Sequence, residues 1–311
     1  MRVAVYSHPD CAAHDMGGGH PERPARLAAV ADALTAAGLA DWLDWREAPL
    51  VEREALLRVH PAAHVERLFD RAPGEGTLAL DGDTLMMPAT LAAARRAAGA
   101  AIAATDAVLA GDCEAAFCNT RPPGHHAERE RAMGFCFFGN VAAAARHALD
   151  VHGLDRVAIC DFDVHHGNGT EDLVADDPRI LFCSTFQYPL FPGYYGPDVP
   201  GQRVNCPLAP GSGGEALREA VDTRWLPALA GFEPQLVLVS AGFDAHRADP
   251  LGGLDWTARD FHWVTERIGE VADASAHGRI VSVLEGGYDL DGLGQSAVAH
   301  LRALLRQPEP A

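Results

Sequence analysis

The sequence has no apolar run long enough to cross a membrane. Every apolar stretch is broken before it reaches the roughly 20 residues that a membrane-spanning helix needs. Its first residues, MRVAVYSHPD, also lack the charged start, apolar centre and small-residue cleavage site of a secretory signal. We therefore expect no membrane partner and a cytoplasmic location.

Cysteine is present but lacks the spacing of a disulfide set or of a thiolate metal site. The seven cysteines are odd in number and scattered, and none is spaced C-x-x-C. This distribution argues against a full set of disulfides and against a zinc site built from thiolates. We expect reduced, mostly packed thiols.

Basic side chains are scarce as well. The chain has 25 Lys and Arg against 43 Asp and Glu, a formal charge of −18. This balance opposes binding to a phosphate backbone, so no nucleic-acid partner is expected, and it would favour cationic substrates. An acidic surface kept for solubility explains the same numbers, so the charge alone does not select a substrate.

What is present is an alternation of short β-branched runs with helix-like segments, in a chain of 311 residues. Strands are expected at residues 2–6, 115–118, 156–164, 179–185, 235–242 and 279–286. Helices are expected at residues 24–37, 89–109, 140–152, 215–229, 257–274 and 293–305. This order predicts an α/β fold with a mostly parallel sheet covered on both faces, in one domain spanning residues 1–311. Residues 188–214 are expected to form a long functional loop, and the oligomeric state stays open.

The most informative segment is RVAICDFDVHHGNG at residues 156–169, where a buried strand carries several polar groups at its end. Alternate residues of a strand share a face, so Asp161, Asp163 and His165 are expected to point the same way. Asp244 follows another predicted strand and can reach the same edge of the sheet. Carboxylate and imidazole ligands of this kind suit one zinc ion with an open position. A lone Asp is more often a solvated cap, but five polar groups, including His166 and Asn168, make that interpretation less favourable.

Two further strand ends carry polar groups. In RPPGHH, His125 and His126 follow a predicted strand, and Asp161 and Asn168 could orient their rings for acid–base work. In LEGGYDL, the Tyr288 hydroxyl could stabilise an oxyanion. By themselves, the histidines could equally be surface residues and the tyrosine a packing residue.

Together, RPPGHH, GFCFF, DFDVHHGNGT, SAGFDAHRADPLGG and LEGGYDL resemble the arginase/deacetylase superfamily. The specific resemblance is to zinc histone deacetylases of the class II type and to bacterial acetylpolyamine amidohydrolases. It runs from about residue 17, where GGGHPERPARL begins, to about residue 290. It implies a single three-layer domain of the arginase/deacetylase fold.

The resemblance also implies roles for individual residues. One zinc ion per chain would be held by Asp163, His165 and Asp244. His126 would be the general base, His125 its electrostatic partner, and Tyr288 the group that polarises the scissile carbonyl. Asp161 would pair with His125 and Asn168 with His126.

Two further sites are implied by the same resemblance. Gly134, Phe135 and Phe191 would line a narrow tunnel for an N-acetyl-alkylamine arm. A structural potassium ion would be held by backbone carbonyls of Asp161, Asp163 and His165 and by atoms around Ser184 and Thr185.

The sequence departs from the family pattern at four places. Asn168 stands where some members have Asp, Gly139 replaces a common Asn, and Phe186 replaces a common His. Leu251, at the tunnel rim, occupies the position where polyamine-selective class II relatives carry an acidic residue. That last difference favours acetyl-lysine-like substrates over polyamines.

The resulting expectation is a zinc-dependent hydrolase that removes acetyl or other short acyl groups from lysine side chains or related alkylamines. Its substrate would be a small acylated amine or an acetylated protein or peptide. The alternatives are an acetylpolyamine amidohydrolase, a dimanganese ureohydrolase and a protein that binds acylated amines without cleaving them. The complete set of His126, Tyr288 and the zinc ligands favours an enzyme.

Overall fold

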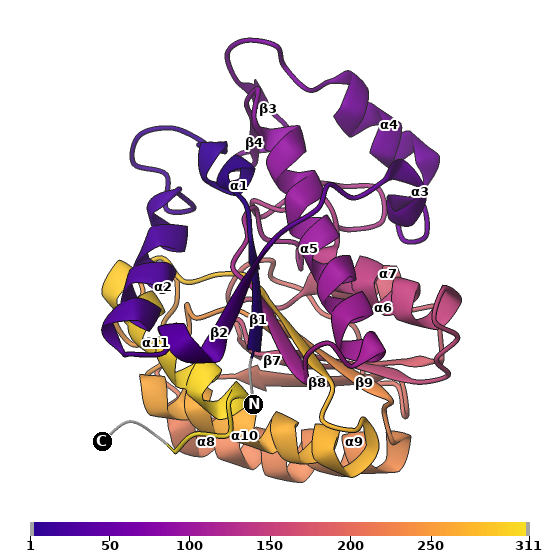
Figure 1. Ribbon diagram of the computed structural model, residues 1–311, viewed down its shortest axis with the longest axis vertical. Coiled ribbons are helices and arrows are strands. Elements are labelled where there is room, and N and C mark those ends of the chain that lie inside the picture. The colour runs from indigo at the N-terminus through magenta and orange to yellow at the C-terminus, as the bar shows by residue number, and fades with distance from the viewer. Residues whose placement is uncertain (1–2, 309–311) are drawn as a thin grey trace.

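The computed structural model describes residues 3–308 and is built around one sheet of eight strands (Figure 1). The strands run in the order β2, β1, β5, β10, β9, β6, β7, β8, and every neighbouring pair is parallel. Their bounds are β1 Val3–Ser7, β2 Leu43–Glu47, β5 Ala115–Cys118, β6 Val157–Asp161, β7 Ile180–Gln187, β8 Arg203–Leu208, β9 Leu236–Ala241 and β10 Ile280–Leu284. A separate antiparallel pair is formed by β3 Leu78–Ala79 and β4 Leu85–Met86.

Helices cover both faces of the sheet, which confirms the predicted three-layer α/β architecture. Figure 1 shows α5 and α6 on the side of the sheet opposite α8, α10 and α11. The α-helices are α1 Pro9–Ala13, α2 Ala25–Ala36, α3 Arg53–Leu56, α4 Ala62–Asp70, α5 Thr90–Ala110, α6 Asn140–Asp150, α7 Asn168–Val174, α8 Gly214–Ala220, α9 Leu226–Phe232, α10 Ala258–Ser275 and α11 Leu290–Leu304. A 3₁₀ turn spans Ala40–Trp42, and a π-helical turn, Val221–Trp225, joins α8 to α9.

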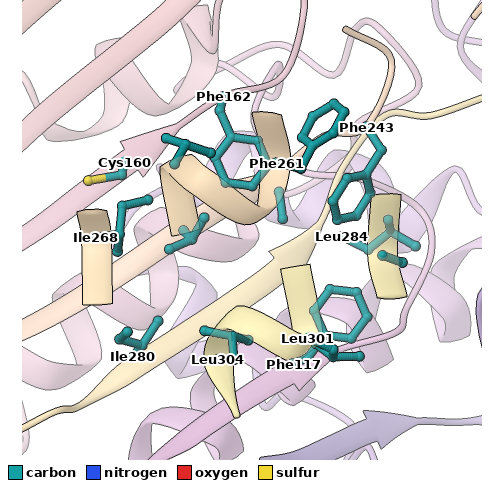
Figure 2. Close-up of a cluster of buried hydrophobic side chains, with 14 of the residues drawn as sticks. Phe117, Cys160, Phe162, Phe243, Phe261, Ile268, Ile280, Leu284, Leu301 and Leu304 are labelled. Carbon is teal, nitrogen blue, oxygen red and sulfur yellow. The ribbon is translucent and has the colours of Figure 1, made fainter. Parts of the chain in front are cut away.

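The strands bury their side chains on both faces in strict alternation. In β1, Val3 and Val5 face α2 and α11, whereas Ala4 and Tyr6 face the side of α5 and α6. This period of two is what a sheet sandwiched between helices requires. Figure 2 shows part of the largest core, where Phe117, Phe162, Phe243 and Phe261 pack with aliphatic side chains of α10 and α11.

The predicted elements are found, with two corrections. The strand expected over residues 156–164 ends at Asp161. Beyond that point the Asp161 side chain accepts the Asp163 N–H and the Asp244 carboxylate accepts the Val164 N–H, so side chains replace the strand ladder. The loop expected over residues 188–214 contains the edge strand β8.

The order of the strands determines where a site can form. The last two strands of the chain, β9 and β10, lie between β5 and β6. The carboxyl ends of β5, β10, β9 and β6 are therefore four neighbours at one edge of the sheet. Ligand sites in open parallel sheets form at this edge. In residues 3–308, no helix combines the length and the apolar character needed to span a membrane.

Candidate active site

Three buried side chains converge at the carboxyl ends of β6 and β9. Asp163 and His165 follow β6, Asp244 follows β9, and one ligand atom of each lies within 4.8 Å of the other two. The His165 Nδ1 atom is 3.1 Å from Asp163 Oδ1 and 3.1 Å from Asp244 Oδ2. The structure thus brings together the three residues expected to bind the metal, although not through a shared strand face, because β6 has already ended.

Two glycines make this cluster sterically possible. A Cβ atom on Gly242 would lie 1.9 Å from Asp163 Oδ2, and one on Gly286 would lie 2.0 Å from Asp244 Oδ2. The Gly286 N–H also donates to Asp163 Oδ2 at 2.8 Å. Any larger residue at either position would displace a carboxylate of the cluster.

The electrostatics of the cluster favour a cation. Burial and the neighbouring charge of Asp163 raise the pKa of Asp244 to about 7. Burial alone would lower the pKa of His165, but hydrogen bonds to Asp163 and Asp244 raise it to about 10. A divalent ion would relieve the repulsion between the carboxylates and take the place of the imidazole proton. The donor set of two carboxylates and one imidazole therefore fits a metal such as zinc.

His125 lies beside this cluster with carboxylates at both ring nitrogens. Its Nδ1 atom is 3.1 Å from Asp161 Oδ2, and its Nε2 atom is 3.7 Å from Asp163 Oδ2. Burial alone would lower the pKa of His125, but the charges of Asp163 and Asp161 raise it well above the usual value. His125 is therefore the positively charged member of the histidine pair.

His126 has a neutral partner instead. Its Nδ1 atom lies 2.8 Å from Asn168 Oδ1, and its ring centroid is 4.0 Å from that of His125. Burial, followed by the charges of His125 and His165, lowers the pKa of His126 well below its usual value. A neutral imidazole of this kind can accept a proton.

The amide of Asn168 is held by residues that the sequence did not reveal. Its Nδ2 donates to Glu128 Oε1 at 2.8 Å and to the Tyr194 hydroxyl at 3.2 Å, and the Tyr194 hydroxyl itself donates to Glu128. These bonds fix the amide so that its oxygen faces His126. Glu128 stands only two residues after His126, which is the signal that could have drawn attention to it.

Glu285 is a second residue without a predicted role. Its buried Oε2 accepts the N–H groups of Gly124 and His125, at 2.7 and 3.1 Å, and burial raises its pKa to about 7. It thereby ties the end of β10 to the loop that carries the histidine pair. A charged residue near the end of the otherwise apolar strand predicted over residues 279–286 is the sequence signal for such a role.

Tyr288 approaches the cluster from the end of β10. Asp249 accepts its backbone N–H at 2.6 Å, and the Arg26 guanidinium lies 4.9 Å from its ring centroid. Burial raises the pKa of the Tyr288 hydroxyl well above its usual value, so this group remains a hydrogen-bond donor at neutral pH.

The residues expected to line a tunnel lie around these groups. The Phe191 ring meets the His126 ring edge-on at 4.9 Å, and the Phe135 ring lies 6.0 Å from that of Tyr288. A Cβ on Gly134 would come within 2.6 Å of the His126 ring. Leu251 is connected less directly, because its N–H donates to Asp249, the residue that also holds Tyr288.

Two of the departures from the family pattern have a local explanation. A Cβ on Gly139 would lie 2.3 Å from the end of the Leu173 side chain, so a larger residue there would require Leu173 to move. Phe186 packs against the His166 ring at 4.5 Å and the Tyr195 ring at 5.0 Å. It thereby supports the aromatic loop that follows β7.

The expected potassium site is adjacent to this region. Ser184 and Thr185 lie on β7, with Ser184 in register with Asp161. The buried Thr185 hydroxyl has no hydrogen-bond partner among the described residues. The potassium site stays a prediction.

Comparison with known proteins agrees with the fold and identifies the family. The family model described as "Histone deacetylase domain" matches residues 20–304. A histone deacetylase-like amidohydrolase of Pseudomonas aeruginosa is 42% identical over 87% of this chain and 73% of its own. The human polyamine deacetylase HDAC10 is 36% identical over 100% of this chain and 49% of its own. The solved structure of the HDA15 HD domain superposes with a TM-score of 0.92 at 31% identity, covering 100% of this chain and 92% of the other.

The fold and the family match thus define an α/β hydrolytic enzyme, with a candidate active site at the carboxyl ends of a parallel sheet. The chain belongs to the histone deacetylase family. It is a deacetylase of the amidohydrolase type, as the resemblance implied.

Proposed function

We propose that this protein is a zinc-dependent deacetylase that hydrolyses N-acetyl amides of lysine side chains or related alkylamines to free amine and acetate. One observation carries the proposal. Two buried histidines lie beside the three-residue cluster, one bonded to a charged partner and the other to a neutral one. His125 is bonded to the Asp161 carboxylate and His126 to the Asn168 amide. One zinc ion per chain would be held by Asp163, His165 and Asp244. When bound, zinc supplies a Lewis acid that polarises the acyl oxygen and acidifies water.

His126 acts first as the general base. Its depressed pKa keeps the imidazole neutral at neutral pH. Since Nδ1 is hydrogen-bonded to Asn168 Oδ1, Nε2 is the nitrogen that is free to accept a proton. It takes a proton from water as the water oxygen attacks the acetyl carbon. It then returns that proton to the amine nitrogen as the carbon–nitrogen bond breaks.

His125 and Tyr288 stabilise the charge that develops in between. His125, kept protonated by Asp161 and Asp163, provides a fixed positive charge next to the reacting atoms. The Tyr288 hydroxyl donates a hydrogen bond to the carbonyl oxygen as that oxygen becomes negative. No covalent bond to the protein forms.

The substrate is an extended, uncharged acyl-amine arm held between aromatic side chains. Phe191 beside His126 and Phe135 beside Tyr288 support this proposal, and Gly134 leaves space next to the base. Leu251 at the rim offers no charge to a second ammonium group, which favours acetyl-lysine. An acetylpolyamine is the second candidate, supported by the similarity to a polyamine deacetylase and by the net charge of −18.

We further propose that residues 1–311 act as one catalytic domain and that a structural potassium ion lies near Ser184. The dimanganese ureohydrolase is disfavoured because the cluster offers one imidazole and two carboxylates, enough for a single ion. A protein that only binds acylated amines would have no use for the oriented His126.

The test is turnover of a fluorogenic acetyl-lysine peptide by the zinc-loaded protein. We expect release of the amine, and a fall in kcat of about 100-fold or more in His126→Ala and Tyr288→Phe, the usual scale for losing a general base or an oxyanion donor. A panel of acetylpolyamines and longer acyl-lysines, compared by kcat/KM, distinguishes the two substrate classes.

Metal analysis provides the independent control. After dialysis against metal-free buffer to remove weakly held ions, one zinc per chain, lost in Asp244→Ala, supports the ligand set, whereas two manganese ions would indicate ureohydrolase chemistry. A folded, zinc-loaded protein with no turnover on any acyl-amine would refute the proposed function.

A further inference from the structure

A second group of potential metal ligands lies away from the active site, where the ends of α5 and α6 meet. Asp106 is in the last turns of α5, His147 is in the last turn of α6, and His152 follows α6 by two residues. The two helices pack side by side (Figure 1). Because each helix leads into the amino end of a strand, this group lies at the edge of the sheet opposite the active site.

The three side chains converge on one point. Asp106 Oδ1 is 2.6 Å from His147 Nε2 and 2.6 Å from His152 Nε2, and one ligand atom of each residue lies within 4.8 Å of the other two. The two imidazole rings are 5.3 Å apart at 72° to each other. Both rings thus present the same nitrogen, Nε2, to a single carboxylate oxygen.

The group is also open to solvent on one side. The side chain of His147 is 12% exposed, that of His152 is 31% exposed and that of Asp106 is 50% exposed. An ion can therefore enter from solution and keep water on its remaining positions. His152 lies just beyond the helix end, where small backbone adjustments can set the ligand distances.

We propose that Asp106, His147 and His152 form a second binding site for a divalent transition-metal ion. Imidazole nitrogen suits zinc, nickel and copper, and one carboxylate completes a three-ligand set with open positions. A bound ion would replace the protons that now lie between the imidazoles and Asp106. It would connect the end of α5 to the end of α6, and this site does not depend on the deacetylase activity.

The competing interpretation is an ordinary hydrogen-bonded group in which both imidazoles donate to Asp106. The two interpretations predict different responses to added metal. A metal site binds one ion beyond the catalytic one and is stabilised by it, since a ligand that binds only the folded state raises its stability. A hydrogen-bonded group does neither.

The experiment uses the full chain with its active site already loaded with zinc. Added zinc is titrated by calorimetry, and one equivalent of Cu²⁺ is followed by electron paramagnetic resonance. We expect one further ion per chain, a copper signal with coupling to two nitrogens, and a rise in Tm with zinc. In His152→Ala and Asp106→Asn the affinity for the added zinc should fall at least about tenfold. Even the loss of a residue that only hydrogen-bonds to a metal ligand typically costs that much.

The matched control is His277→Asn, which removes an exposed histidine outside the group. It should keep the affinity, the copper signal and the zinc-dependent Tm of the unmodified protein. The proposal is overturned if the unmodified protein binds no further ion, or if His152→Ala and Asp106→Asn bind it as tightly as the control.

Discussion

At the scale of single residues, the two adjacent histidines show how a neighbour sets a chemical role. His125 and His126 are both buried and their rings are 4.0 Å apart. The charges of Asp163 and Asp161 make His125 a cation, whereas burial and the charges of His125 and His165 keep His126 neutral beside Asn168, which carries no charge. The different surroundings divide the pair into a fixed charge and a base.

This division predicts the effect of Asn168→Asp. A carboxylate at Nδ1 would favour the protonated form of His126 and raise its pKa by about one unit or more. Because the base works only when neutral, the acidic limb of kcat/KM against pH should move to higher pH by the same amount. Activity on the alkaline plateau should change less.

Measurement of that profile with an uncharged acetyl-lysine substrate checks the prediction. Glu128→Gln, which keeps a partner for the Asn168 amide, serves as the control and should leave the limb nearly where it was. An unchanged limb in Asn168→Asp would mean that His126 is not the group that titrates.

Site residues could be predicted from the sequence where several polar side chains follow an apolar run. Asp163, His165, Asp244 and the histidine pair stand at or just beyond the ends of apolar runs, where so many polar groups together indicate a site. Tyr194 could not be found this way. Its contact with Asn168 depends on the loop after β7 folding back over α7, and spacing in the sequence does not encode that approach.

At the scale of elements, strands buried on both faces were predictable and edge strands were not. β6 and β9 are mostly apolar and fully buried, as strands covered by helices on both sides must be. β2 buries only Leu43 and pairs with only one neighbour, and β8 lies within a Pro- and Gly-rich stretch. Such strands are held by a neighbouring ladder more than by their own composition.

One buried contact between elements has a measurable pH dependence. His300 of α11 lies between Thr265 of α10 and Ser282 of β10, with both ring nitrogens 2.7 Å from a hydroxyl. Burial, followed by the charge of His262, lowers the pKa of His300 to about 3. The folded protein therefore holds His300 neutral where an unfolded chain would protonate it.

The stabilisation from His300 is fully present above the unfolded pKa of about 6.5, and it is lost progressively as pH falls towards 3. When the pH is lowered from about 7.5 to 5.5, the free energy of unfolding of His300→Gln should fall by about 1 kcal/mol less than that of the unmodified protein. The reason is that each pKa unit is worth roughly 1.4 kcal/mol. Urea unfolding at the two pH values measures this difference. Equal losses in the two proteins would show that His300 is not the group responsible.

At the scale of the whole molecule, the excess of acidic residues should influence which substrates arrive fastest. With a formal charge of −18, the protein attracts cationic peptides over distances comparable to the Debye length. The kcat/KM for an acetyl-lysine peptide with arginine flanks should fall several-fold when ionic strength rises from about 0.01 to 0.15 M.

A peptide of equal length with neutral flanks is the matched control, and its kcat/KM should change little. Stopped-flow or initial-rate measurements at subsaturating substrate follow both. If the two peptides respond alike to salt, the surface charge serves solubility and does not guide substrates.

The order β5, β10, β9, β6 places every loop of the active site at one edge of the sheet. The connections that enter β5, β9 and β10, at residues 111–114, 233–235 and 276–279, lie at the opposite edge. The two edges can therefore be engineered independently of each other. Affinity tags, fluorophores or whole reporter domains can be inserted at one edge while the catalytic loops at the other are left as they are.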